Sequence, residues 1–123
     1  MREFSFEKLD VWKQSKKFII DIYRTTKNYP QTEKFGLISQ LRRAALSISS
    51  NIAEGSSRKS AKDQRRFYII AYSSAIEVLN QLIISRELSY LSEEDYFRLR
   101  IDIEKITAMT NRLHDSTSKR INA

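Results

Sequence analysis

The chain contains almost no residues that break helices. Its 123 residues include two glycines, Gly36 and Gly55, and one proline, Pro30. A β-sandwich or β-barrel needs turn residues about every ten positions, and this chain lacks them. Hydrophobic residues still make up 41% of the chain, enough to bury a core. The sequence therefore predicts an all-α fold.

Apolar residues recur at helical spacing in four segments. Short connections between such segments favour an up-down antiparallel four-helix bundle, formed by residues 1–123 as a single domain. The polar tail from about residue 116 is expected to fray. The predicted helices cover residues 7–27, 33–54, 60–88 and 93–115.

The helix boundaries are predicted from local signals. Pro30 follows the first helix, and Gly55 is expected to close the second in a left-handed conformation. Ser60 and Ser92 suit the N-caps of the third and fourth helices. Apolar spacing then predicts the core positions. They are Leu9, Trp12, Ile19, Ile20 and Tyr23 in the first helix; Ile38, Leu41, Ala45, Ile48 and Ile52 in the second; Tyr68, Ala71, Ala75, Leu79 and Leu82 in the third; and Tyr96, Leu99, Ile103, Ile106, Thr110 and Leu113 in the fourth.

The third helix carries a second apolar stripe, formed by Ile69, Ile76 and Ile83, nearly opposite its core stripe. A helix that is apolar on two sides is expected to be buried on two sides. In a bundle of four helices, the outer stripe would then face another subunit. The alternative is that these are scattered exposed isoleucines, which occur on monomers. The stripe favours a homo-oligomer.

Positive charge is concentrated in the first half of the chain. Residues 1–66 carry 15 Lys and Arg against seven Asp and Glu, whereas residues 67–123 carry seven against eight. This asymmetry predicts one positive surface. A helix beginning near residue 58 would place its first basic residues within one arc, where they could bind the phosphates of a polyanion. The alternative is a solvated face that keeps the protein soluble. The candidate nucleic-acid-binding residues are Arg42, Arg43, Arg58, Lys59, Lys62, Arg65 and Arg66.

A polar set lies where the helical pattern predicts burial. Such groups can fix register and oligomeric state when they are paired inside a helical assembly. The alternative to this structural role is that Glu54 and Glu77 form a catalytic carboxylate pair. The set comprises Gln40, Ser47, Asn51, Glu54, Ser74 and Glu77.

Signals for enzymatic chemistry are poor. There is no cysteine, and the only histidine is His114. The chain has no Glu-x-x-His pair for a di-iron bundle and no phosphate-binding Gly-rich loop. We therefore expect no enzymatic activity, no cofactor and no metal. No apolar stretch approaches 18 residues and no leader is visible, so we expect a cytoplasmic protein that does not cross a membrane.

The most specific motifs of the chain are Arg42-Arg43-Ala44 and the segment 47–55, Ser-Ile-Ser-Ser-Asn-Ile-Ala-Glu-Gly, followed by Arg58. They resemble motifs of the family of 23S rRNA intervening-sequence proteins, and the resemblance covers about residues 4–91. The opening segment 6–12, Phe-Glu-Lys-Leu-Asp-Val-Trp, is also similar. One departure is Ser73-Ser74, where the family usually has Gly-Ser, and this puts the helix contact there in doubt.

The resemblance implies a small four-helix bundle that associates into pentameric rings. Some members are encoded within intervening sequences of bacterial 23S rRNA genes. A related branch serves diversity-generating retroelements as a basic pentamer that engages reverse transcriptase and nucleic acid. The first hypothesis is thus a homopentameric protein that binds RNA or DNA. The alternative is a scaffold that docks a partner protein such as a reverse transcriptase.

Overall fold

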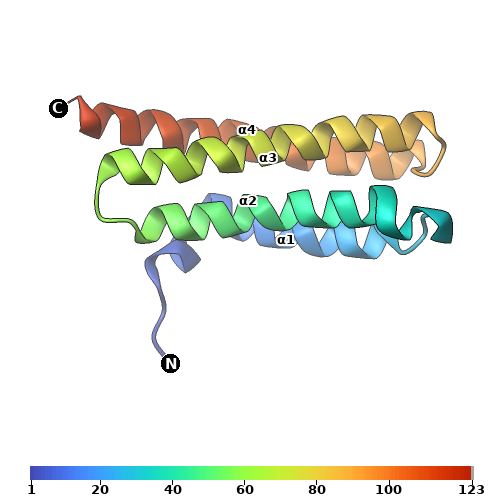
Figure 1. Ribbon diagram of the computed structural model, residues 1–123, viewed down its shortest axis with the longest axis horizontal. Helices are drawn as coiled ribbons and strands as arrows, with labels where there is room; N and C mark the ends of the chain where they lie inside the picture. The colour runs from blue at the N-terminus through green and yellow to red at the C-terminus, as the bar shows by residue number, and fades with distance from the viewer. Residues whose placement is uncertain (123) are drawn as a thin grey trace.

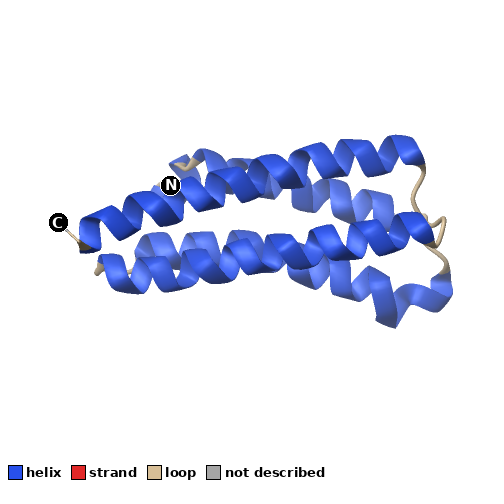
Figure 2. Cartoon of the chain, turned by 90° about the horizontal axis from the view of Figure 1, so that it is seen from above, coloured by secondary structure: helices blue, strands red, loops and turns tan. Residues whose placement is uncertain are grey.

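The computed structural model describes residues 1–122, which form four long helices and no strand. Neighbouring helices run antiparallel, and the connection between the second and third helices lies at the same end as both chain termini (Figures 1 and 2). The prediction of an all-α, up-down four-helix bundle is confirmed. The helices are α1 (Asp10–Thr26), α2 (Ser39–Ser57), α3 (Ala61–Glu87) and α4 (Glu93–Ile121).

Each helix packs against two others. α3 lies between α2 and α4, and α1 closes the bundle from the other side by contacting the same two helices. α1 and α3 therefore occupy opposite corners, and each has an outward side that no other helix of this chain covers.

The core confirms the apolar pattern of α2, α3 and α4. All five predicted positions of α2 are buried, and Leu79 and Leu113 are the only predicted positions of α3 and α4 that stay half-buried. The inner face of α1 was predicted only in part: Leu9, Trp12 and Ile19 are half-buried and pack against the core, but they do not form its centre. Its centre is Val11, Phe18 and Ile22, which are at most 5% exposed. The predicted residue Ile20 is 44% exposed.

The first helix starts later than predicted. Ser5–Lys8 forms a separate 3₁₀ turn, and an extended Leu9 precedes α1. The second helix also starts later, because a 3₁₀ turn (Gln31–Glu33) and a π-helical turn (Lys34–Ile38) come first. Gly36, inside this π-helical turn, has non-helical dihedral angles and marks a kink before α2.

Gly55 does not terminate α2, contrary to the prediction. It is buried within the helix, which continues to Ser57. A Cβ atom at this position would lie 2.6 Å from Cε1 of Tyr68 and 3.0 Å from Cβ of Phe67, so α2 and α3 approach closely here. Left-handed closure occurs instead at Ser89 after α3, with a φ of 62°.

α4 also continues past the predicted end, to Ile121. Thr117 explains the difference, because it is 1% exposed and its hydroxyl donates to the carbonyl of Leu113 at 2.8 Å. The segment predicted to fray is therefore the last part of the helix, and it packs beside the beginning of α3.

Candidate nucleic-acid interface

Five of the predicted basic residues gather where α2 ends and α3 begins. Arg58 is the extended residue that ends α2, and the Ser60 hydroxyl caps α3 by accepting from the Asp63 amide at 3.1 Å. Arg58 and Lys59 thus lie in the connection before α3, so the five residues do not form the single helical arc that a start near residue 58 would give. Lys62, Arg65 and Arg66 follow in the first turns of α3.

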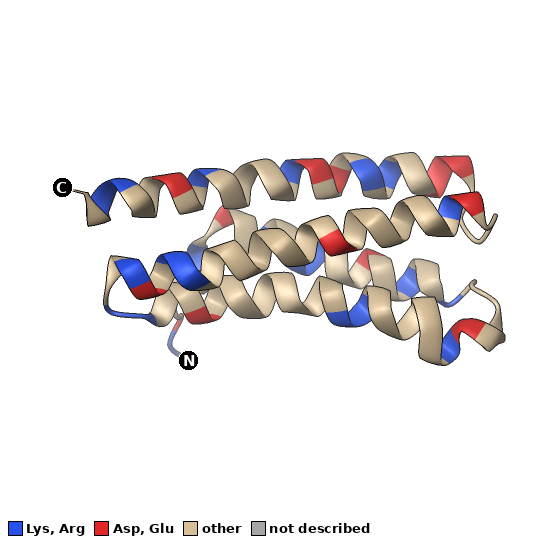
Figure 3. Cartoon of the chain, turned by 45° about the horizontal axis from the view of Figure 1, so that its top comes forward, with Lys and Arg blue, Asp and Glu red and all other residues tan. Residues whose placement is uncertain are grey.

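The carboxyl end of α4 adds two basic residues that the sequence analysis missed. Arg120 donates to Oε1 of Gln64 on α3 at 2.6 Å, and Lys119 is exposed beside it in the chain. Arg65 lies 3.5 Å from the hydroxyl of Ser118, which joins the same two helices. Figure 3 shows basic residues at this end of both α3 and α4. We call the following seven residues the basic corner: Arg58, Lys59, Lys62, Arg65, Arg66, Lys119 and Arg120.

Two carboxylates offset part of the positive charge of the basic corner. Arg58 lies 3.1 Å from Glu54, and Arg66 lies 4.0 Å from Asp63. All four side chains are at least 43% exposed, and such surface pairs are weak. A shallow cavity of about 370 Å³ opens beside them, lined by Lys62, Asp63, Arg65, Arg66 and Ile69. The corner can therefore offer its guanidinium and ammonium groups to an external anion.

The structure separates Arg42 and Arg43 from the basic corner. Arg42 and Arg58 are sixteen positions apart, which is about 24 Å along a helix axis. Arg42 also turns inward, with Nε donating to Thr26 Oγ1 at 3.0 Å and its guanidinium 4.6 Å from the centre of the Tyr23 ring. Arg42 therefore joins α2 to α1. The seven predicted basic residues do not form one continuous positive surface.

Arg43 is also engaged, though more loosely. It bonds Gln40 and lies 3.6 Å from Glu77 of α3, with 68% of its side chain exposed. Glu77 in turn accepts from Gln81 at 3.1 Å. These contacts form a polar line along the outer seam between α2 and α3.

The predicted polar set lies along this seam, but its burial was overestimated. Ser47 and Ser74 share a hydrogen bond of 2.8 Å between the two helices, and Asn51 donates to the Ser47 carbonyl at 2.8 Å. Gln40 and Glu54 are exposed instead, because they lie on the outer edges of α2. Within the set, the serine pair is thus the hydrogen bond that joins α2 to α3.

The polar groups considered for catalysis are not assembled into a site. Glu54 pairs with Arg58 and Glu77 with Arg43, so the two carboxylates belong to separate ion pairs. His114 lies 3.1 Å from Asp115 on the surface of α4. Among residues 1–122 no group of three or more His, Asp or Glu side chains could hold a metal ion.

Beyond the basic corner, the outward side of α3 is nearly free of charge from Ile69 to Ile84. Ile69, Ile76 and Ile83 are 48%, 42% and 38% exposed, and Ile70 and Ile84 are each 42% exposed. Glu77 is the one charged residue between Ile69 and Ile84, and this stretch of α3 is mostly tan in Figure 3. We call these five isoleucines the isoleucine face. α3 is also long and apolar enough to cross a membrane by length and composition alone, so the absence of a membrane span stays a prediction.

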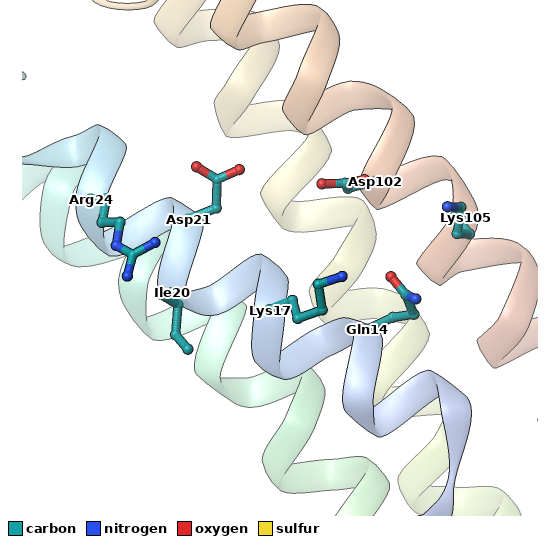
Figure 4. Close-up of a pocket in the computed structure, with 7 residues that line it drawn as sticks. All are labelled: Gln14, Lys17, Ile20, Asp21, Arg24, Asp102 and Lys105. Atoms are coloured by element: carbon teal, nitrogen blue, oxygen red, sulfur yellow. The ribbon is translucent and has the colours of Figure 1, made fainter.

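A second groove, of about 550 Å³, lies between α1 and α4. Lys17 and Asp21 extend into it from α1, and Asp102 extends from α4 (Figure 4). Arg98 holds Asp21 through two hydrogen bonds of 2.9 Å. The groove therefore carries charges of both signs that connect the two helices, whereas the basic corner carries mostly one sign.

Comparison with known proteins supports a family assignment. A solved structure, described as a protein of unknown function from the S23 ribosomal protein family of Bacteroides thetaiotaomicron, shares the fold with a TM-score of 0.77. It is 24% identical, and the match covers 85% of this chain and 97% of that one. No curated protein matches. The family model for 23S rRNA-intervening sequence proteins matches residues 7–112. Because that match spans most of the chain, the protein belongs to the 23S rRNA-intervening sequence protein family.

Proposed function

We propose that the protein is a non-enzymatic homo-oligomer that binds nucleic acid through the basic corner. The observation that carries the proposal is the convergence of seven basic residues, from α3, α4 and the connection before α3, at one end of the bundle. Guanidinium groups bind phosphates through paired donors, and the amino-terminal end of α3 adds a favourable dipole. Such a surface contacts the phosphate backbone and reads little sequence.

The isoleucine face supports the oligomeric part of the proposal. Five exposed isoleucines on one helix are an apolar surface that a second copy of the chain would cover. Several copies of the basic corner in one assembly would strengthen binding by multivalency. A pentamer is the assembly that the family resemblance implies.

Fluorescence anisotropy tests the nucleic-acid part. The purified protein is titrated into a labelled structured RNA, a duplex DNA and heparin at salt concentrations from about 50 to 300 mM. We expect affinity to fall linearly with salt on logarithmic axes, with a slope of about 0.9 per phosphate contact for duplex DNA. An absence of binding to all three at about 50 mM salt would contradict the proposal.

The second candidate is a scaffold that docks a partner protein. The isoleucine face favours it, since the same apolar surface could receive a different chain. Indifference to RNA, together with a purified reverse transcriptase that binds the protein and protects the isoleucine face from hydrogen exchange, would favour the scaffold.

A further inference from the structure

Phe67 lies beside two residues of the basic corner, Arg58 and Arg66. It is half-buried in the second turn of α3. The guanidinium carbon of Arg58 lies 4.7 Å from the centre of its ring, and that of Arg66 lies 5.1 Å away. One arginine comes from the connection and the other from α3, so a single aromatic ring brings together two cations from different segments.

The surrounding packing fixes this arrangement. Gly55 allows α2 to approach Phe67, because any side chain at Gly55 would press on Cβ of Phe67. The backbone of Arg58 is held on both sides: its amide donates to the Gly55 carbonyl at 3.1 Å and its carbonyl accepts from Nε2 of Gln64 at 2.9 Å. The ring and the backbone of Arg58 are therefore positioned before any ligand arrives.

A guanidinium that stacks on a ring keeps its N–H donors in its own plane, where they can bond an anion. The competing carboxylates, Glu54 and Asp63, are more than half exposed and form weak surface pairs. A phosphate can therefore take their place. Lysine cannot substitute fully for either arginine, because an ammonium group has no planar face to stack.

We propose that Phe67 is a positioning residue that holds Arg58 and Arg66 as a paired site for the phosphates of a polynucleotide backbone. The inference rests on the proposed nucleic-acid binding and specifies how the basic corner performs it. Phe67 acts through the two arginines and not by stacking on a base.

The test compares Phe67→Leu, which removes the ring but keeps an apolar side chain, with Phe67→Tyr, which keeps the ring. Phe97→Leu is the matched control. Phe97, on α4, also lies beside an arginine: the guanidinium carbon of Arg86, at the opposite end of α3, is 5.5 Å from the centre of its ring. Binding to a labelled single-stranded oligouridylate is measured by anisotropy, and folding is checked by circular dichroism. We expect Phe67→Leu to bind roughly fivefold to thirtyfold more weakly, the effect of losing two exposed cation–π contacts. Phe67→Tyr and Phe97→Leu should bind like the wild type.

A mutant cycle that combines Phe67→Leu with Arg58→Gln/Arg66→Gln distinguishes a positioning role of the ring from direct contact between the ring and RNA. Once both arginines are replaced, Phe67→Leu should cause no further loss of affinity. If Phe67→Leu lowers the affinity of the double variant as much as it lowers that of the wild type, the proposal is overturned, because the ring must then contact the RNA itself. Should Phe67→Leu fail to fold, Arg58→Lys/Arg66→Lys keeps both charges and should show the same weakening.

The outcomes also separate this inference from the proposed function. If the wild type binds RNA and Phe67→Leu binds equally well, the positioning role is wrong and the basic corner stands. If the wild type does not bind at about 50 mM salt, both are wrong.

Discussion

The two ends of the outward side of α3 differ sharply. At the amino-terminal end, basic side chains from the connection, α3 and α4 are exposed together. From Ile69 to Ile84 the exposed residues are isoleucines with a few small polar residues, and Glu77 is the only charged side chain. Charge and apolar area are thus segregated along one helix. This segregation allows one surface to be buried against another subunit while the other stays accessible to a polyanion.

The largest expected effect comes from placing a charge in the isoleucine face. Ile76→Glu should convert the oligomer to a monomer, because the carboxylate would lose its water in the contact between subunits. The measurement is molar mass by light scattering at micromolar protein concentration.

Ile20→Glu is the matched control for this change. Ile20 is 44% exposed and Ile76 is 42% exposed, but Ile20 lies on α1, at the opposite corner of the bundle. The control should keep the mass of the wild type. A wild type that is already monomeric would show that the isoleucine face is not a subunit contact.

The next largest effect comes from removing charge at the other end of the helix. Arg58→Gln/Lys62→Gln/Arg66→Gln should weaken RNA binding and lower its salt slope by about two to three, because about three phosphate contacts are lost. Arg24→Gln/Lys27→Gln/Lys34→Gln removes the same charge from exposed positions at the far end of the bundle and should change the slope little. Equal losses in the two triple variants would mean that only net charge matters.

A smaller effect is expected where α2 and α3 approach closely. Gly55→Ala should destabilise the fold by about 1 to 2 kcal/mol, because overpacking against the buried Tyr68 ring exceeds the gain in helix propensity. Urea unfolding measures this change. A more stable variant would show that α2 and α3 can separate at this point without cost.

The smallest effect concerns the carboxyl-terminal end of α3. Hydrogen bonds from Arg86 lower the pKa of Glu93, and they join α3 to α4. Because the folded-state pKa lies below the usual 4.5, this contribution to stability is full above that pH and is lost as the pH falls through the folded value. Glu93→Gln should therefore make the unfolding midpoint less dependent on pH below about 4.5. An unchanged pH profile would show that the pair contributes nothing measurable.

The bundle was predictable because three helices have apolar stripes of clear period. The buried face of α1 was predictable only in part, because it includes three polar residues, Ser15, Thr25 and Thr26. Two of them bond carbonyls of their own helix: Ser15 that of Val11 and Thr26 that of Ile22, each at 2.7 Å. A hydroxyl that donates to a carbonyl of its own helix can be buried without a hydrogen-bond partner from another helix. A hydropathy pattern does not show which hydroxyls are buried in this way.

The candidate site was predictable only in part. The run of basic residues from Arg58 to Arg66 is local in sequence, so it identified the main cluster. Lys119 and Arg120 are more than fifty positions away and join it through the fold. The repeat of Thr110, Leu113 and Thr117 was the signal that α4 continues, but it is weak because two of the three residues are polar. The sequence did not reveal that Arg42 packs over the Tyr23 ring, away from the basic corner.

The most direct test of the two surfaces is photo-crosslinking of the wild-type oligomer to RNA that contains 4-thiouridine, followed by mass spectrometry of the peptides. We expect crosslinks in residues 58–67 and at the end of α4, and none in residues 69–84, which the proposed oligomer would bury between subunits. Crosslinks concentrated in residues 69–84, with the basic corner unmodified, would contradict the assignment of the two surfaces.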